Sequence, residues 1–190
     1  MKVGVLAIQG NFDMHSSILE KIGIEPVLVR YPNELDTVEG IVIPGGESTT
    51  MSKLMNRIGF FEPLKSFSKD YPLLGTCAGL ILMSEKVVDT ELDSLGLLDV
   101  QIERNGYGRQ INSNTINIDF KLNNTNYSLP ASFIRAPKII SYGKSLNVIA
   151  KYDDTPIIVE NDRHMGISFH PELDNISILH EYVFINGKKK

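Results

Sequence analysis

The sequence is poor in cysteine, in positive charge and in long apolar runs. Its 190 residues include one cysteine, Cys77, so no disulfide can form within the chain, and a single thiol fits a reducing compartment. The formal net charge of −4 gives no support for nucleic-acid binding. No apolar run approaches the roughly 18 residues of a membrane-spanning helix. We therefore expect a cytoplasmic protein that binds neither nucleic acids nor membranes.

The composition is that of an ordinary globular protein. Hydrophobic residues make up 42% of the chain and charged residues 22%, close to typical values. The length suffices for one domain with a substantial core. No internal repeat, low-complexity tract or linker interrupts the sequence. We expect residues 1–190 to form a single domain.

Short apolar runs alternate with helix-like segments in the first part of the chain. Residues 2–8 form a near-continuous apolar run, as in a strand that is buried on both faces. Residues 13–22 place apolar side chains at helical spacing, and residues 26–30 and 41–43 read as further strands. This order of strand, helix, strand and strand is typical of a parallel sheet with helices on its faces.

The rest of the chain mixes helical and β patterns. Helical patterns cover residues 51–58, 60–67, 80–86 and 176–184, and β patterns cover residues 98–103, 115–122, 126–134, 147–151, 156–160 and 165–169. The two β segments that flank residues 123–126 predict an antiparallel hairpin added to the main sheet. We therefore predict an α/β fold: a mainly parallel central sheet with helices on both faces, plus an antiparallel β extension.

Cys77 lies in the frame Gly75-Thr76-Cys77-Ala78-Gly79, between a predicted strand and a predicted helix. This frame is typical of a nucleophile elbow, a turn so tight that the positions two residues away on either side must lack a side chain. The turn would set the sulfur at a helix N-terminus, where the helix dipole favours thiolate. Because a lone cysteine is more often a small buried hydrophobe, a catalytic role requires a base and a group that orients the base.

The third predicted strand ends in a glycine-rich turn, Pro44-Gly45-Gly46-Glu47-Ser48-Thr49-Thr50. A plain interpretation is a tight turn in which Ser48 or Thr49 caps the next helix. The functional interpretation is that the glycines present backbone N–H groups to an anion or a transition state. No Gly-Lys-Ser/Thr follows, which excludes a Walker A loop. Because ligands bind beyond the carboxyl ends of parallel strands, we expect this turn and the elbow at one edge of the sheet.

Four histidines are candidates for the base. His15 and His180 lie in predicted helices and His164 lies in a polar turn, where a structural or exposed histidine is the commoner outcome. His170 directly follows an apolar strand, and Glu172 is two residues further on. Spacing of two in an extended segment puts both side chains on one side. Glu172 could then orient His170 toward the thiol.

Two loops carry arginines that could bind a carboxylate. Residues 104–110 contain Arg104 and Arg109 together with two glycines, and Arg135 lies in residues 134–137. Ordinary surface loops fit these patterns, and so do carboxylate-binding loops, because the guanidinium fork matches a carboxylate. The acidic residues between positions 89 and 99 have no nearby histidine and no tight ligand frame, so no metal site is predicted.

Several segments together resemble the class I, or triad, glutamine amidotransferases. Within that family, the sequence is most similar to the branch that serves vitamin B6 biosynthesis. The members of this branch are the glutaminase subunits of pyridoxal 5′-phosphate synthase. The resemblance covers nearly the whole chain and implies a flavodoxin-like α/β fold. The cysteine elbow and the His-Pro-Glu segment are shared by the wider family, and the other segments look specific to this branch. The segments are residues 5–10, 44–50, 75–79, 103–105, 108–110, 133–137 and 170–173.

The resemblance implies a role for each matching residue. Cys77 would attack the side-chain amide of glutamine, His170 would act as the base, and Glu172 would orient His170. The backbone N–H groups of Gly46 and Ala78 would form the oxyanion hole. The residues implied in binding L-glutamine are Gly46, Glu47, Ser48, Arg104, Ile134 and Arg135.

The resemblance also implies a partner, a synthase subunit with a (β/α)₈ barrel in a hetero-oligomer. Water at neutral pH would protonate free ammonia to ammonium, which is not a nucleophile, so the ammonia would reach the barrel along a protected path. The barrel would join it to a pentose phosphate and a triose phosphate. Because this chain has no phosphate loop, pyridoxal phosphate would be a product of the complex, and no cofactor is expected here. The flexible Gly45-Gly46 peptide suggests that docking completes the oxyanion hole.

Three alternatives remain at this stage. The chain could feed ammonia to a histidine, purine or folate pathway as a different triad amidotransferase subunit. It could be a cysteine hydrolase that acts alone, similar to a γ-glutamyl hydrolase. It could also be a catalytically silent regulatory subunit, although the intact Cys77, His170 and Glu172 argue against this.

Overall fold

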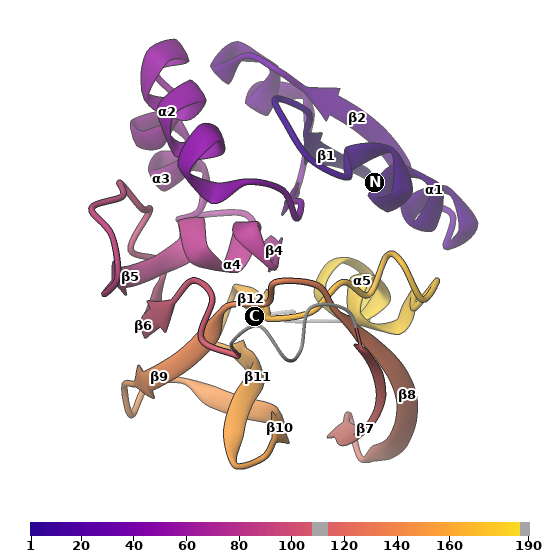
Figure 1. Ribbon diagram of the computed structural model, residues 1–190. Helices are drawn as coiled ribbons and strands as arrows, with labels where there is room; N and C mark the ends of the chain where they lie inside the picture. The colour runs from indigo at the N-terminus through magenta and orange to yellow at the C-terminus, as the bar shows by residue number, and fades with distance from the viewer. Residues whose placement is uncertain (108–113, 187–190) are drawn as a thin grey trace.

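The computed structural model describes residues 1–107 and 114–186 (Figure 1). No helix within these two ranges is both long enough and apolar enough to cross a membrane. In chain order the elements are β1 (Lys2–Leu6), α1 (Phe12–Lys21), β2 (Glu25–Val29), the 3₁₀ helix η1 (Pro32–Thr37), β3 (Ile41–Ile43), α2 (Ser48–Ile58), α3 (Phe61–Phe67), β4 (Leu73–Thr76), α4 (Ala78–Met83), β5 (Ser84–Val87), β6 (Leu98–Glu103), β7 (Asn114–Leu122), β8 (Thr125–Phe133), β9 (Lys138–Tyr142), β10 (Asn147–Tyr152), β11 (Thr155–Glu160), β12 (Met165–Ile167), α5 (Ile178–Glu181) and the π-helix η3 (Tyr182–Asn186).

The central sheet of the described residues has seven strands in the order β10-β11-β12-β4-β3-β1-β2. Strands β12, β4, β3, β1 and β2 pair in parallel, and β10 and β11 add an antiparallel edge. The predicted α/β fold with a mainly parallel sheet is therefore confirmed. The 3₁₀ helix η1 between β2 and β3 matches the short gap between the second and third strands in the sequence.

The predicted hairpin forms, but it does not extend the central sheet. β7 and β8 pair with each other as a separate two-stranded sheet. Phe120, Ala131 and Phe133 from one face of the hairpin are buried in the core. The hairpin therefore packs through this apolar face and not through the hydrogen bonds of a sheet edge. In Figure 1 it lies at the opposite end of the molecule from α2 and α3.

A third sheet has its strands in the order β5-β6-β9, and it differs from the sequence-based expectation in two places. The helix expected over residues 80–86 ends at Met83, because the Ser84 hydroxyl donates to the carbonyl oxygen of Ile81 at 2.7 Å and the chain then turns into β5. Side-chain to backbone bonds of this kind compete with the helix. Strand β9 was not predicted from the sequence. It pairs with β6 in antiparallel orientation.

Alternate residues of the central strands face two separate cores. Ile41, Ile43 and Leu73 belong to a core that includes residues of α2, α3 and α4. Val42 and Leu74 belong to a second core that includes residues of α1, α5 and the hairpin. All five side chains are fully buried. Because both faces are covered, groups on these strands meet solvent only at the strand ends.

Strand β4 lies between β3 and β12, and all three run parallel. The N–H of Cys77 donates to the carbonyl oxygen of Ile167 at 2.8 Å, which continues the β4–β12 ladder by one residue. Parallel strands end at one edge of a sheet. The segments that follow these strands, which contain Gly46, Cys77 and His170, therefore emerge together.

Replacing Gly79 with alanine tests how closely the elbow is packed. A Cβ atom at Gly79 would lie 2.0 Å from the carbonyl oxygen of Ile43, a backbone atom that cannot rotate away. We expect Gly79→Ala to lower the free energy of unfolding by about 2 kcal/mol, as overpacking does. Urea unfolding followed by circular dichroism measures this loss.

The control for that measurement is Gly59→Asn. A Cβ atom at Gly59 meets nothing within 4 Å, and asparagine tolerates its left-handed φ of 72°. This variant should lose much less stability. An equal loss in both variants would contradict the steric explanation.

Candidate active site

Cys77 stands at the tip of a strained turn between β4 and α4. Its φ of 49° and ψ of −102° lie outside the regions that non-glycine residues favour, which costs on the order of 1–3 kcal/mol. A Cβ atom at Gly75 would lie 2.7 Å from the backbone of Gly79, so the turn needs both glycines. The turn sets the thiol at the sheet edge while the chain passes directly into α4.

His170 and Glu172 meet Cys77 at this edge. Nδ1 of His170 donates to Oε1 of Glu172 at 2.6 Å, since a carboxylate only accepts. Burial alone would lower the pKa of His170, but its hydrogen bonds to Cys77 and Glu172 and the negative charges of both raise that pKa to about 10. The segment from His170 to Glu172 is a turn and not the extended segment expected from the sequence. The turn nevertheless brings the carboxylate to the ring.

Glu172 is a fully buried carboxylate whose two oxygens face different histidines. Oε2 lies 3.4 Å from Nε2 of His15, which is on α1. Nδ1 of His15 lies 2.9 Å from Nε2 of His180, which is on α5. Burial opposes ionisation of Glu172, but the hydrogen bond from His170 and the neighbouring imidazoles outweigh this effect and lower its pKa. The site is therefore a buried row of polar groups that runs inward from the thiol.

The glycine-rich turn after β3 is fixed against the loop between β1 and α1. The N–H of Asn11 donates to the carbonyl oxygen of Gly45 at 3.0 Å. The side-chain oxygen of Gln9 accepts from the N–H of Glu47, also at 3.0 Å. A Cβ atom at Gly45 would lie 2.3 Å from Cε1 of His170. The turn therefore packs directly on the imidazole, which only glycine permits.

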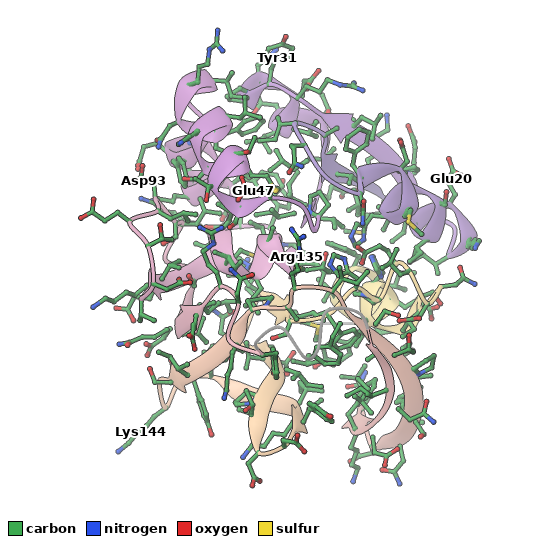
Figure 2. The ribbon with its side chains drawn as sticks, viewed as in Figure 1. Glu20, Tyr31, Glu47, Asp93, Arg135 and Lys144 are labelled. Atoms are coloured by element: carbon green, nitrogen blue, oxygen red, sulfur yellow. The ribbon has the colours of Figure 1, made fainter. Side chains whose placement is uncertain are left out.

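A cavity of about 330 Å³ opens beside Cys77. The sulfur of Cys77 lies 4.0 Å from the carbonyl oxygen of Ile134. Ala78 begins α4, and the first N–H groups of a helix have no acceptor within the helix. Figure 2 shows Arg135 beneath Glu47, the residue that precedes α2. The cavity is lined by Gly46, Glu47, Ser48, Cys77, Ile81, Arg104, Asn105 and Arg135, and six of these residues were predicted for the site from the sequence.

Glu47, and not Ser48 or Thr49, caps α2. Its Oε1 accepts from the N–H of Thr49 at 3.0 Å, and its Oε2 accepts from the N–H of Thr50 at 2.7 Å. Burial opposes ionisation, but the hydrogen bonds from Thr50 and Thr49 lower the pKa of Glu47 to about 2. Nη2 of Arg104 lies 3.3 Å from Oε1 of Glu47. Glu47 is favoured over Ser48 or Thr49 as the N-cap because its one carboxylate accepts from two helix N–H groups and also pairs with an arginine.

Three residues that the sequence analysis singled out, Gly108, Arg109 and Gln110, lie outside the described residues. Across residues 1–107 and 114–186, no group of three or more histidine, cysteine or acidic side chains is arranged to hold a metal ion.

His15 and His180 were not connected with the site from the sequence. Both are fully buried, and the structure joins them to the carboxylate of Glu172. A signal was present: His15 shares the buried face of α1 with Ile18 and Leu19. A histidine among apolar side chains needs a polar partner inside the protein.

Comparison with known proteins identifies the family of the chain. The model of the SNO glutamine amidotransferase family matches residues 5–189. The chain belongs to this family. A Thermosipho africanus (strain TCF52B) protein named pyridoxal 5′-phosphate synthase subunit PdxT is 47% identical over 100% of both chains. A Francisella philomiragia protein of the same name is 42% identical over 98% of both chains. A crystal structure of a glutamine amidotransferase is 36% identical, with a TM-score of 0.88 over 95% of this chain and 96% of its own.

Glu47→Gln tests how the carboxylate supports the start of α2 in this amidotransferase. Loss of the charge weakens the bonds to the helix amides, and we expect stability to fall by about 1 kcal/mol at pH 7. The folded pKa of about 2 lies below the ordinary 4.5, so this stabilisation is present above pH 4.5 and is lost as the pH falls toward 2. Urea unfolding should show a smaller loss at pH 3 than at pH 7. Glu62→Gln, at a side chain that is 83% exposed, is the control, and a loss independent of pH would count against the cap.

Cys77→Ala tests the coupling between the thiol and His170. In the wild type we expect the His170 ring to remain protonated up to a pH near 10, in line with its pKa. Without the sulfur, burial still disfavours the cation while one hydrogen bond and one negative charge are gone, so the pKa of His170 should fall. Nuclear magnetic resonance titration of ¹⁵N-labelled histidine measures both values. An identical pKa in the two proteins would show that the thiol does not interact with this ring.

Proposed function

We propose that this chain is the glutaminase subunit of a pyridoxal 5′-phosphate synthase. It hydrolyses L-glutamine to L-glutamate and ammonia and supplies the ammonia to a synthase subunit. The observation that carries the proposal is the row of Cys77, His170 and Glu172 beside a cavity with two arginines. Membership of the amidotransferase family and the names of the relatives support it. We assign residues 1–190 to one functional domain.

The first chemical step forms a thioester. The sulfur of Cys77, with its proton transferred to His170, attacks the side-chain amide carbon of glutamine. The carbon–nitrogen bond then breaks, and the nitrogen leaves as ammonia with the proton from His170. Glu172 holds the ring through Nδ1, so the other ring nitrogen performs both proton transfers.

The second step hydrolyses the thioester. His170 accepts a proton from water, whose oxygen attacks the same carbon. The carbon–sulfur bond breaks and its electron pair stays on the sulfur, which restores the Cys77 thiolate beside the protonated His170. The new carboxylic acid of glutamate releases its proton to solvent, and glutamate leaves as the carboxylate. Both steps place negative charge on the carbonyl oxygen, and the backbone N–H groups of Gly46 and Ala78 are the donors that we assign to it.

Glutamine binding is assigned to the cavity. Arg104 and Arg135 are the partners for the α-carboxylate, because a guanidinium matches it with two hydrogen bonds. Arg104 is already paired with Glu47, so a substrate carboxylate would exchange with, or share, this internal partner. Ser48 and the backbone of Ile134 complete the glutamine site.

The partner in this proposal is a synthase subunit with a (β/α)₈ barrel, which joins the ammonia to a pentose phosphate and a triose phosphate. Docking is proposed to complete the oxyanion hole. The carbonyl oxygen of Gly45 is held by the N–H of Asn11, so a partner that moves the loop between β1 and α1 would release the Gly45-Gly46 peptide. No cofactor takes part in the hydrolysis, and pyridoxal phosphate is the product of the complex.

Glutamate release from glutamine by the purified chain, with and without the synthase barrel, tests the proposal. We expect weak activity from the chain alone, strong activity with the barrel, and none from Cys77→Ala in either case. Strong activity that the barrel does not change would indicate a free-standing cysteine hydrolase. Activation by a different synthase would assign the chain to another amidotransferase pathway. Absence of glutamate release under all conditions would indicate a silent regulatory subunit.

A further inference from the structure

Glu172 carries a buried oxygen that the catalytic row does not use. Oε1 accepts the bond from His170. Oε2 is buried, and among the described residues no hydrogen bond of regular geometry reaches it. Nε2 of His15 lies 3.4 Å away, and both side chains are completely buried. A charged oxygen in the interior is costly without a donor, so this contact calls for a proton on Nε2 of His15.

His15 is held by polar groups on both sides of its ring. Nε2 lies 3.2 Å from the hydroxyl oxygen of Thr76, the residue before the catalytic cysteine. Nδ1 lies 2.9 Å from Nε2 of His180. The two imidazole centroids are 5.1 Å apart. Figure 1 shows α1 and α5, which carry these histidines, close to each other although they come from opposite ends of the chain.

Both histidines are neutral in this environment. Burial lowers the pKa of His15 to about 4, with Glu172 raising it and His170 lowering it to smaller extents. Burial also lowers the pKa of His180 well below its usual value, His15 adds to this effect, and a hydrogen bond with the backbone of Ile176 opposes it. A neutral imidazole carries a single N–H, so the pair has two tautomer patterns.

The two patterns differ in what faces Glu172. In the first, Nε2–H of His180 donates to Nδ1 of His15, and Nε2–H of His15 is shared between the hydroxyl oxygen of Thr76 and Oε2 of the carboxylate. In the second, Nδ1–H of His15 donates to His180, and a bare nitrogen faces a bare oxygen. Only the first pattern gives the ionised oxygen a donor. Leaving a buried charged group without a hydrogen bond costs more free energy than leaving a neutral ring nitrogen without one.

We propose that His15 is a positioning residue for hydrolysis: its Nε2–H donates to Oε2 of Glu172. The inference rests on the proposed glutaminase function. With one oxygen held by His15 and the other by His170, the carboxylate cannot turn away from the catalytic imidazole. The ring of His170 then stays directed at Cys77 through both proton transfers.

Three variants distinguish a positioning role of the His15 N–H from a role of the His15 side chain in packing alone. His15→Met removes the N–H but keeps a long apolar side chain, and His15→Gln offers an amide N–H at similar reach. The matched control is His164→Met. It also removes a buried histidine, whose Nδ1 accepts from the N–H of Leu73 at the start of β4, the end of the strand away from the site.

Turnover in the complex with the synthase subunit is the first readout. His15→Met should lower kcat by about 10–100-fold with KM little changed, the size of effect known for partners that orient a site residue. His15→Gln should recover most of that loss. His164→Met should lose stability in thermal unfolding and keep the kcat of the wild type.

Alkylation of Cys77 by iodoacetamide in the isolated chain is the second readout, and it needs neither glutamine nor the partner. His15→Met should move the pH of half-maximal alkylation upward, because a carboxylate that is free to turn away from His170 supports the charge of that ring less well. His15→Gln and His164→Met should leave this pH unchanged. In ¹⁵N-labelled wild-type chain, the proton of His15 should be on Nε2.

The outcomes distinguish the two proposals. Wild-type kcat and alkylation in His15→Met, or a proton on Nδ1 of His15, would overturn the positioning role. If the wild-type complex releases no glutamate but the alkylation profile of His15→Met shifts as expected, the proposed function fails and the role of His15 at the Cys77 site stands.

Discussion

The parallel pairing of β4 with its two neighbours is the constraint on which the whole site depends. The pairing brings three strand ends to one edge, so the cysteine, the histidine and the glycine-rich turn arrive together from distant parts of the sequence. The hydrogen bond from Cys77 to Ile167 extends that pairing to Cys77 itself. A strained backbone at Cys77 is tolerated because the strands around it fix both ends of the turn.

The burial of charged side chains is a second constraint on the site. His170 and Glu172 are both nearly free of solvent, and isolated charges there would be unstable. The row from the thiol to His180 alternates donors and acceptors, so each charged group has a partner and no single pair has to compensate for the full loss of hydration. Removing one member would therefore disturb its neighbours more than a simple count of hydrogen bonds predicts.

The sequence predicted those features that depend on local sterics and on strand order. The two glycines around Cys77 and the apolar strand before His170 were enough to place the elbow and His170 at one edge. The strand at residues 84–87 was missed, because its short segment matched a helix until a serine hydroxyl ended the turn. His15 and His180 were missed for a different reason. Each lies in an ordinary amphipathic segment, and only the folded chain shows that they meet.

The contact between His15 and His180 joins residues that are 165 positions apart, and it has a consequence for synthesis. A ribosome completes β4 and its cysteine long before β12, His170 and α5 exist. Long-range pairings of this kind form late and slowly. A nascent chain thus carries a thiol without its base or the support for its carboxylate. Until residues 170–172 have been made and folded, the thiol has no imidazole beside it, so we expect shorter nascent chains not to hydrolyse glutamine.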